Sequence, residues 1–437
     1  MPEYTKMGQK GRVDMLQKNG NGTPEDYMRQ VLELARQGEG RVSPNPMVGC
    51  VVVKDGKVIA SGYHEQYGGY HAERNALLNC KENTEGAELY VNLEPCCHYG
   101  KTPPCTEIII EKNIRKVYIG CLDSNPKVAG KGVQILREHG ILVETGILEQ
   151  ECRACNEVFF HFMEQRMPFL AMKYAMTLDG KIACETGDSK WVTGEGARAY
   201  VHRLRNRYRG IMAGIGTVLA DDPLLNCRIE GGRDPIRIIC DSKLRVPLDS
   251  QIVQTSSQIE TIVAWNPEEA GRWRAGQGPG TPKPGQEEAE GMPLGEKVKQ
   301  LGRHGVILLE IPTWAQQGGA AKEGQPVGLQ GNLPICRPAA QRDQGQLSLP
   351  GLFRQLAERG IDSILLEGGG ALNASALQEG LVQRVYAFIA PKLVAGAKAK
   401  SPVEGRGIPR MADAVRLTDV EITRFGEDLC MAGRTVT

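Results

Sequence analysis

The stretch from residue 71 to residue 105 decides how the first half of the chain is interpreted. It opens with HAE (residues 71–73) and closes with PCCHYGKTPPC (residues 95–105). One imidazole, His71, and two thiols, Cys96 and Cys105, suit a tetrahedral zinc site. Such a site leaves its fourth position open, which is typical of catalytic zinc. Bound zinc lowers the pKa of water in that position to roughly 7. Glu73 then suits proton transfer between this water and a leaving amine.

The spacing of the two cysteines narrows the class of enzyme. Zinc nucleobase deaminases carry H-x-E followed by P-C-x-x-C, and their glutamate is a general acid/base and not a ligand. Here the second cysteine follows the first by nine positions. This long loop resembles the deaminase half of the bifunctional riboflavin-biosynthesis deaminase/reductase family. Cys97, where a serine is expected, and His98 are further candidate ligands. We assign the metal to Cys96 and Cys105, because a Pro-Cys turn at a helix start positions these two thiols.

Length and composition limit the number of domains, the kinds of partner and the cellular location that we expect. A chain of 437 residues predicts roughly two or three domains. The net charge of +1, from 53 basic and 52 acidic residues, gives no field that would recruit nucleic acid or an acidic membrane. We find no run of 18 apolar residues and no apolar signal core, and the odd number of cysteines, 13, favours reduced thiols over disulfides. We therefore expect a cytoplasmic protein.

The first half alternates helical and strand patterns. Residues 1–23 are polar and aperiodic and predict a flexible extension, and a helix start follows at Thr23-Pro24. Strands then alternate with helices over residues 24–150, which predicts a three-layer α/β domain. Asn45 either binds the pyrimidine, as the resemblance implies, or caps a turn. Residues 151–167 predict a helical linker, whose Cys152-x-x-Cys155 lacks the second pair that a metal site needs.

The second half, residues 168–437, predicts another α/β domain. Buried strands are expected at 170–176, 211–214 and 236–241. Gly-, Pro- and Gln-rich runs predict flexible insertions around 266–300 and 313–346. The glycines at 368–370 follow a strand and precede a helix, so they either approach a phosphate or form a tight turn. They are not the G-x-G-x-x-G of a Rossmann domain.

Short motifs in this half resemble the reductase half of the same family. They are Lys173, TLDG (177–180), SKW (189–191), Thr217 with DDP (221–223), EGGG (367–370) and APKL (390–393). The resemblance implies a dihydrofolate-reductase-like fold that uses NADPH. The expected fold class is therefore α/β throughout, with a cytidine-deaminase-like three-layer domain followed by a dihydrofolate-reductase-like domain.

The resemblance also implies the residues of the second site. Cofactor contacts are implied at Ala175, Trp191, Thr217, Asp221, Ser242, Gly369, Gly370, Ala371, Leu372, Asn373, Ala374 and Ser375. Substrate contacts are implied at Ser189, Arg205, Leu225, Arg228 and Glu367. The two arginines suit a sugar phosphate because a guanidinium forms forked hydrogen bonds, although each is otherwise a surface charge. Lys173 is a further candidate contact near the reacting imine.

The implied reaction has two steps. The first is hydrolytic deamination of 2,5-diamino-6-(5-phosphoribosylamino)pyrimidin-4-one with one zinc ion per chain. The second is NADPH-dependent reduction of the ribosyl to a ribityl chain. We expect a homo-oligomer, a dimer or a tetramer, without nucleic-acid or membrane partners. Two alternatives are a nucleic-acid base-editing deaminase and a non-catalytic zinc-binding module. The near-zero charge and the long loop disfavour the first, and Glu73 disfavours the second.

Overall fold

The computed structural model describes residues 22–125, 127–276, 292–313 and 345–436. The chain divides into two compact units between Gln165 and Arg166. The expected extension therefore lies outside the described residues, except for its last two positions. No helix within these ranges is both long and apolar enough to cross a lipid bilayer.

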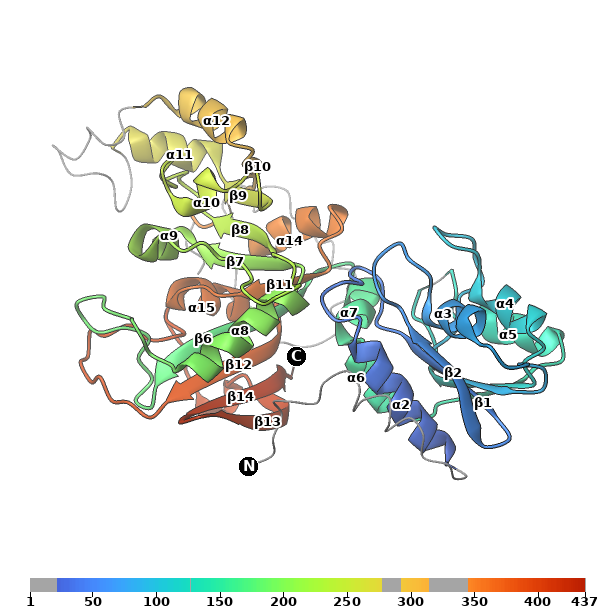
Figure 1. Cartoon of the computed structure of the whole chain (residues 1–437). Helices are drawn as coiled ribbons and strands as arrows, with labels where there is room; N and C mark the ends of the chain where they lie inside the picture. Colours follow the sequence, from blue (N-terminus) through green and yellow to red (C-terminus); the bar gives the residue numbers. More distant parts are fainter. Residues whose placement is uncertain (1–21, 126, 277–291, 314–344, 437) are drawn as a thin grey trace. The chain divides into compact units, whose positions relative to one another are not determined.

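The first unit is a five-stranded sheet covered by helices on both faces (Figure 1). Its strand order is β2-β1-β3-β4-β5, in which β1 runs antiparallel to β2 and β3 while β3, β4 and β5 are parallel. The strands are β1 (Gly49–Lys54), β2 (Lys57–Tyr63), β3 (Glu88–Leu93), β4 (Lys116–Cys121) and β5 (Leu142–Thr145). The helices are α2 (Pro24–Arg36), α3 (Ala72–Asn79), α4 (Cys105–Glu111), α5 (Lys131–Glu138), α6 (Glu149–Cys155) and α7 (Glu157–Gln165).

Helices α2 and α6 contact each other on one face of this sheet, and α3, α4 and α5 contact one another in turn on the other face (Figure 1). The expected three-layer arrangement is thus confirmed. Helix α2 begins as the sequence indicates, because Thr23 and Asp26 form a reciprocal capping box.

The expected linker, 151–167, mostly consists of helices α6 and α7. Their side chains Cys152, Phe159 and Phe160 are buried in the core of the first unit. Cys152 fits only because position 120 is glycine: a Cβ there would lie 2.3 Å from the Cys152 sulfur. These helices therefore complete the first unit.

The second unit is a nine-stranded sheet in the order β10-β9-β8-β7-β11-β6-β12-β14-β13. The first seven strands in this order are parallel, and β14 and β13 add an antiparallel edge. The strands are β6 (Phe169–Thr177), β7 (Gly210–Gly214), β8 (Ile236–Cys240), β9 (Thr261–Trp265), β10 (Ile307–Glu310), β11 (Ser363–Leu366), β12 (Val382–Ala390), β13 (Leu417–Phe425) and β14 (Asp428–Thr435). The helices are α8 (Glu195–Arg207), α9 (Ile215–Asp221), α10 (Gln251–Gln254), α11 (Pro267–Arg274), α12 (Leu294–Arg303), α14 (Leu349–Glu358) and α15 (Gly370–Gln378), with the short 3-10 helix η4 (Met411–Asp413).

Alternate residues of the central strands of this sheet belong to two different cores. Met212 and Ile238 pack with α14 and α15, whereas their neighbours Ile211 and Ile239 pack with α9 to α12. This follows from strand geometry, since successive side chains point to opposite faces. Both faces are apolar because helices cover both, as expected of a parallel sheet.

The first expected insertion, 266–300, is narrower in the structure. Helix α11 and most of α12 lie within it, and they bury Ala270 and Trp273. Residues 277–291 between them lie outside the described residues, as do 314–344 of the second expected insertion. The helical pattern is difficult to detect in the sequence because charged residues separate the few buried ones.

Candidate functional site

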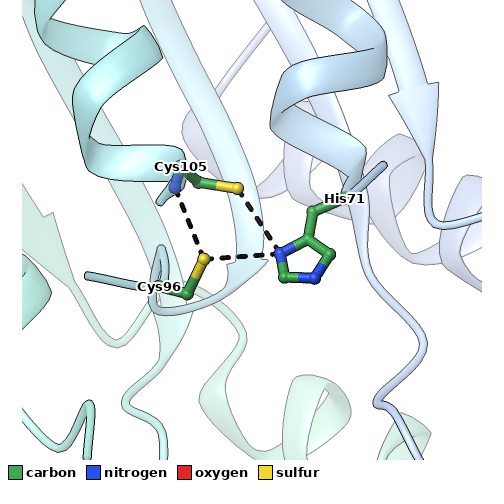
Figure 2. A group of neighbouring side chains, drawn as sticks. All are labelled: His71, Cys96 and Cys105. Atoms are coloured by element: carbon green, nitrogen blue, oxygen red, sulfur yellow. Dashed lines mark hydrogen bonds between the residues drawn. The ribbon is translucent and has the colours of Figure 1, made fainter. Parts of the chain in front are cut away.

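Three side chains converge at one end of the first sheet. His71 is the N-cap of α3, Cys96 follows the end of β3, and Cys105 is the first residue of α4. Figure 2 shows their side chains facing one another, with His71 Nδ1 lying 3.4 Å from Cys96 Sγ and 3.5 Å from Cys105 Sγ. Among the residues that the structure describes, this is the only group of His, Cys, Asp and Glu close enough to hold a metal ion.

The donor set fits zinc. Zinc binds thiolate sulfur at about 2.3 Å and imidazole nitrogen at about 2.0 Å, so tetrahedral geometry separates these atoms by roughly 3.5 Å. The two nitrogen-to-sulfur distances agree with this separation. The Cys105 amide also donates to Cys96 Sγ, over 3.4 Å. Hydrogen bonds from the Cys105 thiol and from His71 lower the pKa of Cys96, which favours the thiolate form that binds a metal ion.

Glu73 lies in the first turn of α3 and borders the same cavity as His71 and Cys96. Its side chain is buried, at 3% exposure. Burial, reinforced by the negative charge of Cys96, raises the pKa of Glu73 to about 7. A carboxyl group in this environment exchanges protons readily near neutral pH.

A cavity of about 320 Å³ adjoins these residues. Asn45 and His64 line it, and Asn45 Nδ2 lies 3.1 Å from His64 Nε2. Because the Tyr70 carbonyl, 2.9 Å from Nδ1, is only an acceptor, Nδ1 carries the proton and Nε2 accepts from Asn45. Burial lowers the pKa of His64, which favours this neutral form.

The other candidate ligands lie elsewhere. Cys97 Sγ is 3.7 Å from the carbonyl oxygen of Lys127, and Cys97 is outside the metal group. His98 lines the cavity, and its Nδ1 is buried without a hydrogen-bond partner among the described residues. Cys152 is buried in the core and Cys155 packs against it, so neither belongs to the metal group.

Sequence reasoning missed several cavity residues. His64, Asp123 and Asn125 line the cavity but belong to no spacing motif, whereas Lys101 lies within the motif at 95–105 and was given no role. Glu94 was also missed: its carboxylate accepts from the backbone amides of Asp123, Gly130 and Val133 over 3.3, 2.9 and 3.1 Å. It thereby fixes the loop after β4. The signal that could have found these loop residues is their position in the sheet. The loop follows the carboxyl end of β4, a parallel strand next to β3, and ligand sites of α/β sheets lie at that edge.

Two adjoining cavities open in the second unit, one of about 560 Å³ and one of about 420 Å³. Both are bordered by Ser189, Thr217, Asp221 and Gly369. The larger is also lined by the expected cofactor residues Ser242, Gly370, Ala371, Leu372 and Ser375. The smaller is lined by the expected residues Ala175, Trp191, Arg205, Arg228 and Glu367, together with Lys173. The remaining expected residues, Leu225, Asn373 and Ala374, are buried and line neither cavity.

The larger cavity fits a nucleotide. Gly369 is the N-cap of α15, and a Cβ there would meet no atom within 4 Å, so the backbone is open to a ligand. At Gly370 a Cβ would lie 2.4 Å from Glu404 Cγ, so close packing requires glycine. Open backbone amides at a helix N-terminus suit a phosphate group.

Glu367 is the electrostatic centre of the smaller cavity. Arg205 donates two parallel hydrogen bonds to its carboxylate, over 2.7 and 3.1 Å, and Lys173 Nζ lies 3.3 Å away. Burial would raise the pKa of Glu367, but the charges and hydrogen bonds of Arg205 and Lys173 lower it to about 2. The guanidinium fork that we expected to bind a sugar phosphate is therefore engaged by Glu367. Arg228 is exposed and donates from Nε to Asn226 Oδ1 over 3.2 Å.

Two protein-family models match the chain. Residues 22–121 match the cytidine and deoxycytidylate deaminase zinc-binding region, and residues 168–275 and 299–431 match the RibD C-terminal domain. The chain is 44% identical to the riboflavin biosynthesis protein RibD of Actinobacillus pleuropneumoniae over 409 residues, which is 94% of each protein. The chain belongs to the RibD family. It is also 34% identical to the RibD of Escherichia coli strain K12, covering 93% of this chain and 98% of that one.

Solved RibD structures share the fold of the whole chain. The Acinetobacter baumannii RibD, at 32% identity, gives a TM-score of 0.74 and covers 95% of this chain and 99% of that one. A Thermotoga maritima structure, described as a diaminohydroxyphosphoribosylaminopyrimidine deaminase/5-amino-6-(5-phosphoribosylamino)uracil reductase, gives 0.71 at 34% identity and covers 94% and 99%.

These comparisons confirm the family, the fold class and the two activities expected from the sequence. The chain is a bifunctional RibD-type enzyme of riboflavin biosynthesis, with a zinc-dependent deaminase domain and a reductase domain that uses a nucleotide cofactor. The two alternatives, a base-editing deaminase and a binding module, do not account for the match of the reductase domain.

Proposed function

We propose that the first unit removes the 2-amino group of 2,5-diamino-6-(5-phosphoribosylamino)pyrimidin-4-one, and that the second reduces the ribosyl group of the product with NADPH. The arrangement of Glu73 in one cavity with His71 and Cys96 is the observation that carries the first step. The described activities of the Thermotoga maritima protein support both steps.

In the first step, we assign His71, Cys96 and Cys105 to one zinc ion per chain. When bound, zinc supplies the Lewis acidity that makes water a nucleophile near neutral pH. Glu73 takes a proton from the water that attacks the amino-bearing carbon and delivers it to the departing nitrogen. The carbon–nitrogen bond breaks, a carbonyl forms, and ammonia leaves.

We assign Asn45 to orientation of the pyrimidine. Its amide nitrogen donates to His64, whose other ring nitrogen is held by the Tyr70 carbonyl. This chain fixes the rotation of the Asn45 amide and makes its oxygen the atom that accepts from a ring N–H or amino group. His64 acts through Asn45 and is a positioning residue.

In the second step, the cofactor supplies a hydride to the imine carbon of the ring-opened ribose, and a proton goes to the imine nitrogen. Lys173 lines the substrate cavity and carries protons on Nζ, so we assign it to the polar contact near this nitrogen. Glu367 holds Lys173 and Arg205 in place through its two partly buried ion pairs. The cofactor is assigned to the larger cavity, with its phosphates at the N-terminus of α15.

Ammonia release and NADPH oxidation test the two steps separately. The zinc-loaded protein should release ammonia from the diamino substrate and then consume NADPH. The Glu73→Gln variant should do neither with this substrate, yet should oxidise NADPH when given the deaminated product. Glu65→Gln, which removes an exposed carboxylate of the same unit, is the matched control. Ammonia release that persists in Glu73→Gln would refute the role of Glu73.

We also propose that the protein is a homodimer or homotetramer. The edge strand β13 supports this, because it exposes the apolar side chains Val420 and Ile422. Light scattering coupled to size exclusion measures the mass directly. A monomer at micromolar concentration would refute this part of the proposal.

A further inference from the structure

Trp191 is a large aromatic side chain that the fold leaves open to solvent. It lines the smaller cavity of the second unit and is 64% exposed. The other tryptophans that the structure describes, Trp265 and Trp273, are buried. Leaving an indole exposed gives up the free energy that its burial would contribute. At a cavity wall this indicates contact with a ligand, and a flat aromatic ring is the partner that suits the face of an indole.

Arg198 lies against one face of this indole. Its guanidinium carbon is over the Trp191 ring, 4.6 Å from the ring centre, and its Nη1 donates to the Thr193 carbonyl over 2.6 Å. Arg198 belongs to the first turn of α8 and lines the same cavity as Trp191. A guanidinium is attracted to the π-electrons of an aromatic ring. Arg198 therefore fixes the plane of the indole from a helix.

The backbone of Trp191 is held from a second element. Lys392, in the loop after β12, donates from Nζ to the Trp191 carbonyl over 2.7 Å. That loop is tied to the loop after β6, because the Lys392 carbonyl accepts from the Leu178 amide over 2.8 Å. Asp179 also accepts from the Ala395 amide over 2.7 Å. One ring face and the carbonyl of Trp191 are thus fixed, and its large exposed fraction leaves the opposite face to a ligand.

We propose that Arg198 is a positioning residue of the reductase, which holds Trp191 so that the open face of the indole stacks on the flat heteroaromatic ring of a bound ligand. Two such rings reach this region, the pyrimidine of the substrate and the nicotinamide of the cofactor, because the two cavities adjoin and share Ser189 and Gly369. The inference rests on the proposed function, which assigns these ligands to the two cavities. It adds a residue that acts through Trp191.

Steady-state kinetics of NADPH oxidation with the deaminated substrate test this role on the full chain. Arg198→Gln should raise the KM of the ligand that stacks on Trp191 roughly 3- to 30-fold, which is the range for loss of a cation–π contact. The change in kcat should be smaller, because stacking stabilises the ground state and the transition state alike. A higher KM for the deaminated substrate identifies the pyrimidine, and a higher KM for NADPH identifies the nicotinamide. If both KM values stay at the wild-type level, the inference is wrong.

A double-mutant cycle shows whether Arg198 acts through Trp191. Trp191→Ala should raise the same KM, and Arg198→Gln should add nothing in that background, because the indole that it positions is gone. Arg198→Lys keeps a cation against the ring and should recover part of the loss. Arg203→Gln, which removes an exposed arginine of the same helix outside both cavities, is the matched control and should change nothing. If the effects of the two substitutions on KM multiply, Arg198 acts independently of Trp191 and the inference is refuted.

The other roles open to Arg198 give different results. If Arg198→Gln raises KM for the phosphorylated substrate but not for its dephosphorylated form, Arg198 binds the phosphate and does not position Trp191. If the variant only lowers the melting temperature, its role is structural and the inference also fails. A wild type that does not oxidise NADPH with the deaminated substrate would instead remove the reductase assignment, and this inference with it.

Discussion

Replacing Glu367 with glutamine tests how the reductase site is held together. Glu367 is 11% exposed, and its two partners, Arg205 and Lys173, are 13% and 15% exposed. Glutamine keeps the shape of the side chain but removes its charge. Two nearly buried cations would then lack their counter-ion, and the fork of Arg205 would lose one acceptor oxygen.

The size of the effect follows from the pKa of Glu367. Its ordinary value is 4.5, and the folded protein lowers it to about 2. A shift of one pKa unit corresponds to about 1.4 kcal/mol, so the ionised carboxylate contributes about 3 kcal/mol to the free energy of unfolding. Breaking a buried ion pair by removing one partner costs about 3–5 kcal/mol. We therefore expect Glu367→Gln to lower the free energy of unfolding by about 3 kcal/mol at pH 7.

Tryptophan fluorescence measures this change in the second unit alone. The four tryptophans stand at positions 191, 265, 273 and 314, all after the boundary between the units. Trp265 and Trp273 are buried, so denaturant unfolding should shift their emission to longer wavelength. Asp413→Asn is the matched control: Arg410 forms the same fork with Asp413, but Arg410 is 75% exposed. An exposed pair of this kind contributes less than about 1 kcal/mol.

The pH dependence gives a second measurement. Because the pKa of Glu367 is lower in the folded than in the unfolded state, its contribution is complete above pH 4.5 and is lost as the pH falls towards 2. The difference in stability between wild type and Glu367→Gln should therefore be constant near neutral pH and narrow in acid. A difference below about 1 kcal/mol at pH 7, or one that acid leaves unchanged, would contradict the reasoning.

Three further predictions concern a buried arginine, a closely packed glycine and the metal ion. Arg237→Met should destabilise the second unit by about 3 kcal/mol in the same fluorescence assay. Arg237 is fully buried, and without its hydrogen-bond donors several neutral acceptors in the interior would lack a partner. Gly49→Ala should abolish ammonia release but not reduction of the deaminated substrate, since its Cβ would lie 2.1 Å from the Val31 carbonyl oxygen. Removing zinc with a chelator should likewise stop ammonia release but not NADPH oxidation with the deaminated substrate. Loss of both activities would show that the two sites do not work independently.

Features that depend on nearby residues could be predicted from the sequence. The turn at Asp55-Gly56 needs two residues with positive φ, and the structure gives them values of 50° and 76°. The capping box at Thr23 fixes the start of α2. The HAE and PCCHYGKTPPC motifs locate three side chains that the fold brings together. In each case the feature is set by residues a few positions apart, or by motifs that can be recognised within a short stretch of sequence.

Features that depend on long-range contacts could not be predicted. Strand β9 and the hairpin of β13 and β14 were missed, and β13 is exposed along most of its length and therefore lacks an alternating apolar pattern. Arg237 interrupts an apolar strand, and only the folded chain supplies its acceptors, which are Leu224, Ile252, Thr255, Ile259 and Thr261. Residue type alone does not reveal such partners.

Arg205 and Arg228 show the same limit at the substrate site and lead to a final prediction. Both were assigned to the sugar phosphate by residue type, but the fork of Arg205 is engaged by the partly buried Glu367, whereas Arg228 is exposed and lines the cavity. Arg228→Gln should therefore raise KM for the phosphorylated substrate roughly 10- to 100-fold with little change in kcat. Arg205→Gln should instead lower the stability of the second unit by about 3 kcal/mol.

The dephosphorylated substrate separates these two roles. Without a phosphate to bind, wild type and Arg228→Gln should show the same KM, because the lost hydrogen bonds have no counterpart in this substrate. Arg205→Gln should remain destabilised whichever substrate is used, since its partner Glu367 belongs to the protein. If Arg228→Gln changes kcat and KM equally for both substrates, Arg228 does not read the phosphate. The phosphate would then need Arg198, the other arginine lining this cavity, whose guanidinium lies 4.6 Å from the centre of the Trp191 ring.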